Sequence, residues 1–288
     1  MTSQFASIGR GRFVMGVLLA LGAWQLGCED VGKKSAAAAR DNVTFIAAAA
    51  KQDVTEVRSG LPQGAGSITK LFSDAAPEVP GAEDARSALE RARETVQDLR
   101  VAKSTFFAVV HADGRVIRND REQDLMAGKN LFQFFPGLQA ASEYFEGRGS
   151  MPEAAGVRGR EDGQWLAAVP VRLDGSVRGY YVTGWSWSAY AYRLETGLRS
   201  HILTGAKSGE KIPLLYVFVV VDKNVHGAPV SPKVNAEAIA KAGPLAKASA
   251  GAPWTTVLTI DGREFGLAVQ LVPELGDKVA LAVLRSET

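Results

Sequence analysis

Two pairs of segments, about a hundred residues apart, repeat the same succession of apolar and polar runs. The first pair is "FFAVVHADGRVIRND" (106–120) and "LYVFVVVDKNVHGAP" (215–229), each an apolar strand, a tight turn and a return strand. The second pair is "WLAAVPVRLDGSVRGYYVTGWS" (165–186) and "FGLAVQLVPELGDKVALAVLRS" (265–286), each with a proline and a tight turn between two strands. The chain is therefore predicted to fold as two copies of one antiparallel plan. Because single strands are too apolar to face water on both sides, helices must cover at least one face of each sheet.

A helical pattern precedes the first copy. In residues 31–58 apolar side chains recur at spacings of three and four, which predicts a long helix; they are Val43, Ile46, Ala50, Val54 and Val57. The Gly- and Pro-containing segment 59–66 predicts the end of that helix, and 74–85 predicts a second break. A further helix is expected at 82–102, with a sparse apolar face made of Leu89, Val96 and Leu99.

These elements predict four parts of the chain. They are a leader (1–27), an anchor region with the long helix (28–81), a first unit (82–205) and a smaller second unit (206–288). Within the first unit, the glycine-rich segment 147–159 lacks the Lys-Ser/Thr ending of a phosphate-binding loop and is expected to be an ordinary loop.

The single cysteine, Cys28, follows an uncharged and mostly apolar run at 13–26. That run has the length of a signal-peptide core and is shorter than the ~20 residues of a membrane-spanning helix. Gly27 precedes the cysteine and charged residues follow it, an order that resembles a bacterial lipoprotein signal, in which the cysteine is acylated and becomes the first residue. Gln25 and Leu26 stand where such signals carry a leucine and a small residue. An uncleaved membrane anchor and an exported chain with a free thiol therefore stay open as alternatives.

Charge and cysteine content exclude several classes of function. The chain has 33 Lys+Arg and 31 Asp+Glu, and the two surplus positive charges, Arg10 and Arg12, lie ahead of Cys28. The remainder is neutral, which gives no basis for nucleic acid as a partner. One cysteine excludes an intramolecular disulfide and a cysteine-based zinc cluster. The three histidines lack metal-site spacing and no nucleophile motif is present, so we expect no enzyme activity, no metal and no cofactor.

The order of elements resembles the PAS-like extracellular sensor domains known as Cache, and the tandem resembles a double Cache module. "FFAVVHADGRVIRND" is similar to the first hairpin of such a domain, "GKNLFQFFPGL" (128–138) to the segment after it, and "EDGQWLAAVPVRLDGSVRGYYVTGWS" (161–186) to its closing strands. The resemblance implies an α+β fold with two units, each an antiparallel sheet flanked by helices, behind a long N-terminal helix. It also implies a location outside the cytoplasm and a small-molecule ligand.

The candidate ligand-binding residues are Arg118, Arg158, Trp165 and Tyr181. Amino-acid-binding members of the family carry a Tyr, Arg, Trp-Tyr, Asp signature; here the spacing of Arg158 and Trp165 differs and Leu166 follows the tryptophan, so an amino-acid ligand is not predicted. Strand alternation puts Tyr181 and Trp185 on one face of their strand, and Tyr180 and Val182 on the other. One set is expected in the core, while the other either lines a ligand pocket or packs like any strand aromatic.

Two functions follow from this reading. The first is a non-catalytic, lipid-anchored sensor in the cell envelope, facing the periplasm or the exterior. Because the sequence stops at "LAVLRSET" directly after a strand, such a sensor is expected to signal through a separate membrane protein. The alternative is an envelope structural or assembly protein that uses the same fold as an interaction surface. A closed cavity with converging polar groups in the first unit favours the sensor, and a filled core with an exposed apolar patch favours the assembly protein.

Overall fold

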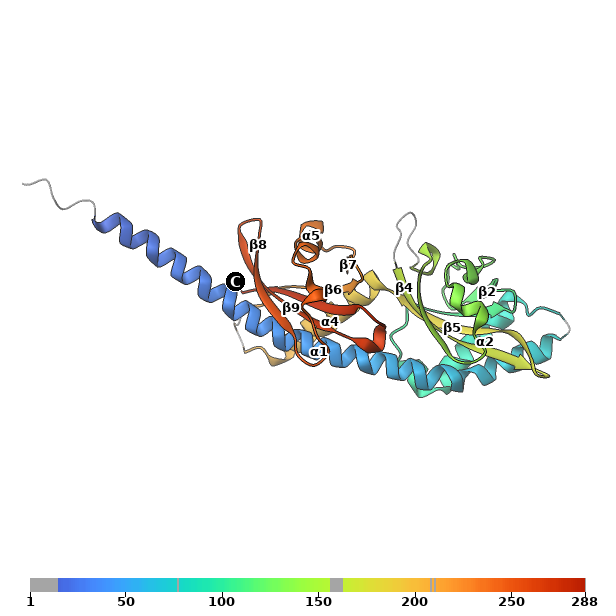
Figure 1. The fold of residues 1–288 in the computed structure, drawn as a ribbon. Coiled ribbons are helices and arrows are strands. Elements are labelled where there is room, and N and C mark those ends of the chain that lie inside the picture. The colour runs from blue at the N-terminus through green and yellow to red at the C-terminus, as the bar shows by residue number, and fades with distance from the viewer. Residues whose placement is uncertain (1–14, 77, 156–162, 208, 210, 288) are drawn as a thin grey trace, which may run out of the picture.

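One helix, α1 (Met15–Ala75), runs along the molecule and carries two β-sheets on one side (Figure 1). The computed structural model describes residues 15–76, 78–155, 163–207, 209 and 211–287, with side chains from residue 31 onward. The first part of α1 projects beyond both units, as Figure 1 shows. Cys28 falls within this helix, but its side chain is outside the described part.

The first unit has a five-stranded antiparallel sheet in the order β2-β1-β5-β4-β3. Its strands are β1 (Phe106–His111), β2 (Val116–Asn119), β3 (Phe145–Ser150), β4 (Gly163–Leu173) and β5 (Ser176–Ser186). Its helices are α2 (Ala82–Thr95) and α3 (Gln97–Val101), with short 3-10 turns η1 (Leu131–Gln133), η2 (Pro136–Ala140) and η3 (Pro152–Ala155).

The second unit repeats this topology, in the order β7-β6-β10-β9-β8. Helix α4 (Trp187–Gly205) leads into it from β5. Its strands are β6 (Leu214–Val221), β7 (Asn224–Gly227), β8 (Trp254–Ile260), β9 (Arg263–Leu271) and β10 (Val279–Ser286). Its other elements are α5 (Lys233–Lys241), η4 (Pro244–Ala246) and η5 (Pro273–Leu275). The α+β fold with two copies of one plan, predicted from the sequence, is confirmed.

The apolar stripe of α1 forms the spine of the largest core cluster, which reaches both sheets. Every residue of the predicted stripe is fully buried: Val43, Ile46, Ala50, Val54 and Val57. The helix also meets the second sheet at very short range. A Cβ atom placed on Gly266 of β9 would lie 2.1 Å from the backbone nitrogen of Ala36, so only glycine allows this crossing.

The predicted end of the long helix at 59–66 is wrong. Helix α1 continues through Pro62 to Ala75. An interior proline costs a helix about 3 kcal/mol and bends it, and α1 is visibly not straight (Figure 1). Tertiary packing offsets this cost, because Ile68, Leu71 and Phe72 continue the buried stripe beyond the proline.

Two smaller differences from the sequence prediction concern the first unit. The helix expected at 82–102 is divided at Val96, whose backbone is extended (φ −108°, ψ 112°), into α2 and α3. Its predicted apolar face is buried nonetheless. The segment expected to be a loop at 147–159 begins as the second half of β3, which pairs with β4. Glycine and charged residues in β3 hid the strand pattern, since neither favours a strand.

Candidate functional site

A column of stacked aromatic rings lies between the first sheet and α1. Trp165 of β4 stacks on Trp185 of β5, with 4.3 Å between ring centroids and 15° between planes. Trp185 stacks in turn on Tyr190 of α4, at 4.6 Å and 11°. All three side chains are buried. Trp165, one of the predicted ligand-binding residues, therefore packs in the core, where the column fixes the start of α4 against the sheet.

The column ends on a buried polar cluster that joins α4 to α1. The guanidinium of Arg193 lies 5.0 Å from the Tyr190 ring centroid. Asp53 of α1 accepts hydrogen bonds from the Tyr190 hydroxyl (3.0 Å) and from Nη2 of Arg193 (2.9 Å). Burial raises the pKa of Asp53 above its ordinary value although the positive charge of Arg193 opposes that change. Burial likewise raises the pKa of Tyr190 and lowers that of Arg193.

Tyr181 lies on the same face of the first sheet, beneath α1 and α2. Its ring stacks on Phe107 of β1, with 6.1 Å between ring centroids. The guanidinium of Arg93, on α2, lies 4.9 Å from the Phe107 ring centroid. Arg93 pairs with Asp120 at 2.8 Å. The Tyr181 hydroxyl has no hydrogen-bond partner among the described residues. Burial, followed by the charge of Asp120, raises the pKa of this hydroxyl, so Tyr181 is a neutral core residue.

Arg118 of β2 lies on the same face of the sheet as Tyr181, because both residues pair in register with Val109 of β1. Its Nη1 atom is 3.3 Å from Oδ2 of Asp124, and the two side chains are 9% and 5% exposed. Asp124 also accepts backbone N–H groups from Asn119 (2.8 Å), Met126 (2.8 Å) and Ala127 (3.0 Å). Arg118 and Asp124 thus hold the loop after β2 in place. Strand β1 separates Arg118 from Tyr181, and the Arg118 guanidinium pairs with Asp124. Arg158 lies outside the described residues.

The face of the first sheet opposite α1 is filled by apolar side chains. The predicted division is confirmed, since Tyr181 and Trp185 belong to the cluster beneath α1, and Tyr180 and Val182 to the opposite one. Both sets pack in cores, so neither lines an open pocket. The second cluster comprises Phe106, Ala108, Val110, Val116, Met126, Leu131, Phe135, Leu138, Met151, Ala154, Leu166, Ala168, Tyr180 and Val182.

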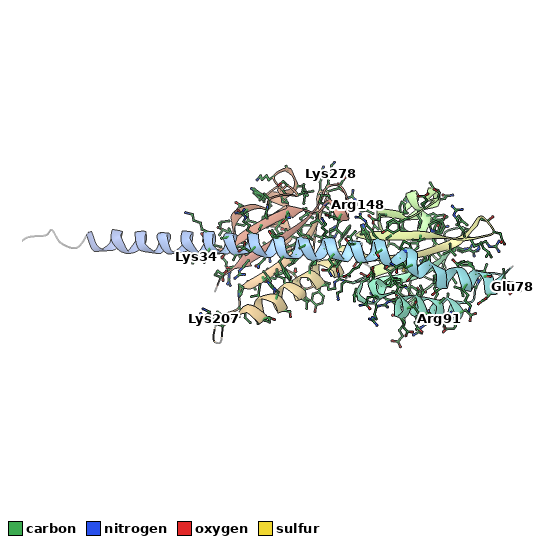
Figure 2. All side chains as sticks on the ribbon, turned by 90° about the horizontal axis from the view of Figure 1, so that it is seen from below. Lys34, Glu78, Arg91, Arg148, Lys207 and Lys278 are labelled. Atoms are coloured by element: carbon green, nitrogen blue, oxygen red, sulfur yellow. The ribbon has the colours of Figure 1, made fainter. Side chains whose placement is uncertain are left out.

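A cleft of about 830 Å³ opens where the two units meet. Arg148 of β3, labelled at this junction in Figure 2, lies 3.4 Å from Asp222, which follows β6. The two side chains are 33% and 53% exposed, so the pair is accessible to solvent. The described residues lining the cleft are Arg148, Gly149, Ser150, Gly163 and Trp187 of the first unit and its junction, and Val221, Asp222, Asn224, Val225 and His226 of the second.

A second crevice of about 280 Å³ shares Arg148 with the cleft. At its rim Arg58 of α1 donates two hydrogen bonds to the carboxylate of Glu146, at 2.6 and 2.8 Å, and a third to the Glu274 carbonyl at 3.3 Å. Lys51 pairs with the Glu274 carboxylate at 3.3 Å. The hydrogen bond to Glu146 raises the pKa of Arg58. These contacts tie α1, β3 and the second unit together beside the cleft.

Sequence reasoning named one residue of this junction, Trp165, which lines the smaller crevice, and missed the charged residues around it. Arg58, Glu146, Glu274, Arg148 and Asp222 come from separate parts of the chain, and no local motif connects them. The usable signal was the paired charges Glu146 and Arg148 two positions apart, which in a strand share one face. That signal was hidden because the segment was expected to be a loop.

Two kinds of feature are absent from the described residues. No three His, Cys, Asp or Glu side chains in that part of the chain gather in a way that would hold a metal ion. No helix among the described residues combines the length and the apolar character that a membrane span requires.

No protein-family model matches the chain, and no curated protein matches it. Several solved structures do. The extracellular domain of a protein described as a histidine kinase, vpHK1S-Z8, matches with TM-score 0.57 and 9% identity, over 90% of this chain and 93% of its own. A domain of a sensory box/GGDEF family protein from Vibrio parahaemolyticus matches with TM-score 0.54 and 9% identity, over 89% and 97%.

The ligand-binding domain of the Campylobacter jejuni chemoreceptor Tlp3, in complex with 4-methylisoleucine, matches with TM-score 0.51 and 9% identity, over 89% of this chain and 92% of its own. At this level of identity the matches show the fold alone. The chain has the double Cache fold, with two PAS-like units in series along a long N-terminal helix.

Proposed function

We propose that this chain is a non-catalytic module of the cell envelope that binds a small polar molecule between its two units. We further propose that lipid on Cys28 holds it at the membrane and that a separate membrane protein receives its signal. The fold supports this proposal, because it is shared with domains described as belonging to a chemoreceptor and to a histidine kinase. Because fold alone does not assign function, the ligand proposal depends on the residues that line the cleft between the units.

The observation that carries the proposal is that the cleft joins ionisable groups of both units. A molecule bound there contacts β3 of the first unit and the β6–β7 turn of the second, so its binding favours one arrangement of the units over others. Helix α1 packs on both sheets and runs on toward Cys28. A change between the units therefore has a direct route along α1 to the membrane side.

The charges in the cleft indicate the class of ligand. An exposed ion pair such as Arg148–Asp222 contributes at most about 1 kcal/mol, so a ligand can replace it at little cost. The guanidinium of Arg148 can donate two parallel hydrogen bonds to a carboxylate, and the carboxylate of Asp222 can accept hydrogen bonds from an ammonium group. A free amino acid carries both groups, and the matching Tlp3 domain holds an amino-acid derivative. Zwitterionic amino acids and related small acids are therefore the first compounds to test.

Thermal-shift screening of the exported chain with Cys28→Ser tests the ligand. A compound present at 100 times its dissociation constant adds about 2.7 kcal/mol of stability. For a chain of this size that raises Tm by roughly 5–10 °C. Arg148→Ala and Asp222→Ala should remove the shift, while Arg115→Ala, an exposed arginine of another hairpin, should keep it. No shift across a broad panel of amino acids and small acids would contradict ligand binding.

One observation favours the assembly protein as the second candidate. The face of the first sheet opposite α1 is filled with apolar side chains, and Arg118 is committed to Asp124. If the chain acts only through protein contacts, cross-linking in intact envelopes will give the same partner in the same yield with and without every compound of the panel, and the Arg148→Ala variant will retain that yield.

A further inference from the structure

The two sheets share one topology but differ at one edge. In the first unit the edge strand β3 carries Glu146 and Arg148, which form ion pairs with Arg58 and Asp222. In the second unit the corresponding strand β8 reads "WTTVLTI" and contains no charge, no proline and no glycine. Natural edge strands are usually protected by charges, proline, bulges or a covering segment. Strand β8 contains no charged residue and no proline, and its regular pairing with β9 includes no bulge.

The turn between β8 and β9 determines which backbone groups of β8 point toward its free edge. Asp261 and Gly262, with φ of 50° and 76°, form a two-residue turn of the hairpin type between β8 and β9. The residues that close such a turn, Ile260 and Arg263, form a hydrogen-bonded pair, and bonding alternates from there. Thr255, Val257 and Thr259 therefore direct their N–H and C=O groups away from β9. Within the described part of the chain, these groups take part in no backbone hydrogen bond outside the β8–β9 ladder.

A groove of about 580 Å³ accompanies this edge, between β8 and α1. Thr255, Thr256 and Val257 form one wall. The other wall belongs to the part of α1 at which the helix leaves the second unit, near β8 (Figure 1); it comprises Lys33, Ala36, Ala37, Arg40 and Asp41. The two alanines leave room for side chains, and Arg40 places a guanidinium on this wall.

We propose that β8 is a docking edge for an extended segment of another protein, which joins the second sheet as an additional strand. Strand addition supplies main-chain hydrogen bonds for affinity and alternate side-chain pockets for specificity. An added strand lies about 4.8 Å from β8, so every second side chain enters the groove beside α1. The exposed guanidinium of Arg40 on this wall selects a segment with an acidic side chain at such a position. This inference goes beyond the proposed ligand site and does not depend on it.

A second copy of the chain is a poorer occupant. Two copies that pair antiparallel through β8 are related by a two-fold axis perpendicular to the sheet. Since α1 packs on the face of that sheet, the axis reverses the direction of α1. The two N-termini then point to opposite sides, which does not suit two chains held in one membrane by the lipid proposed on Cys28; this step alone rests on the proposed anchor.

Binding of a designed peptide by the exported chain tests the proposal. The probe is a fluorescent seven-residue peptide of alternating Thr and Val with glutamate at one central position. A comparison peptide of the same sequence carries lysine at that position. The glutamate peptide should bind about fivefold more tightly, the value of one exposed charge pair. Arg40→Glu should abolish or reverse this preference, whereas Lys70→Glu, an exposed lysine farther along α1, should keep it.

Backbone pairing is tested at Thr255. Thr255→Pro removes an outward N–H group and leaves the ladder to β9 intact, so peptide binding should be lost. Thr255→Val changes the side chain but keeps the N–H group, so binding should remain. Thermal unfolding of each variant shows whether it is folded, and Arg40→Glu provides the test if Thr255→Pro is not. Equal binding by Thr255→Pro, no preference for glutamate, no binding at all, or a dimer that Thr255→Pro disrupts would each overturn the proposal.

Discussion

Replacing Gly66 by alanine should stabilise the protein by about 0.5–1 kcal/mol, because glycine inside a helix is that much less favourable than alanine. Gly66 belongs to the segment in which the sequence predicts a break and the structure has α1. It is exposed, and a Cβ atom placed on it meets no atom within 4 Å. The gain should therefore be realised without a steric cost. Urea unfolding followed by circular dichroism should show a higher midpoint with an unchanged m value.

Gly64, two residues earlier, is the matched control. A Cβ atom there would lie 2.6 Å from Cδ1 of Leu99 and 2.9 Å from Cε1 of Tyr181, and both side chains are fully buried. Overpacking a core costs about 1–3 kcal/mol, which outweighs the helical gain. Gly64→Ala should therefore destabilise by up to about 2.5 kcal/mol. If Gly66→Ala is neutral or destabilising, or if both variants change stability by the same amount, α1 does not continue through this segment as described.

Three further predictions concern the anchor and the buried charges. Cys28→Ser should abolish lipid labelling and detergent-phase partitioning; unchanged partitioning contradicts the anchor. Burial raises the folded-state pKa of Asp53 and of Asp120 above 3.8, so the stability that each contributes is complete below its unfolded pKa and lost as pH rises through the folded value. Urea unfolding at a series of pH values should show the wild type losing stability, relative to the double variant Asp53→Asn plus Asp120→Asn, as the pH rises through the folded-state pKa values. A gain in relative stability over the same pH range would refute the raised pKa values. Arg118→Met should lower the free energy of unfolding by about 3 kcal/mol, since it leaves the buried Asp124 carboxylate without its counter-charge. It should leave peptide binding at β8 unchanged. An unchanged free energy of unfolding would mean that the pair is not buried.

The parts of the fold that the sequence predicted are those with local signals. Alternating strands around Asp174–Gly175 and Asp261–Gly262 determine two of the hairpins, and both aspartates adopt the positive φ that such turns require. The apolar stripe of α1 was equally local. The continuation of α1 past Pro62 was not, because it depends on contacts with Leu99 and Tyr181, which are distant in sequence.

The candidate site shows the same limit. Alternation within β5 places Tyr181 and Trp185 on one face, but it does not relate that face to the face of Arg118 on β2. That relation requires the order β2-β1-β5 and the register between its strands, which are long-range properties. The junction of Arg58, Glu146 and Glu274 joins three segments of the chain, so no local pattern could have indicated it.

Isothermal titration calorimetry tests the central claim, ligand binding between the units, most directly. The compound with the largest thermal shift should bind the wild type with one site per chain. Arg148→Ala and Asp222→Ala should each weaken binding by about tenfold or more, the value of a lost charge-assisted hydrogen bond. The Arg115→Ala control should bind like the wild type. Binding that survives both cleft variants unchanged would place the ligand elsewhere and contradict the account.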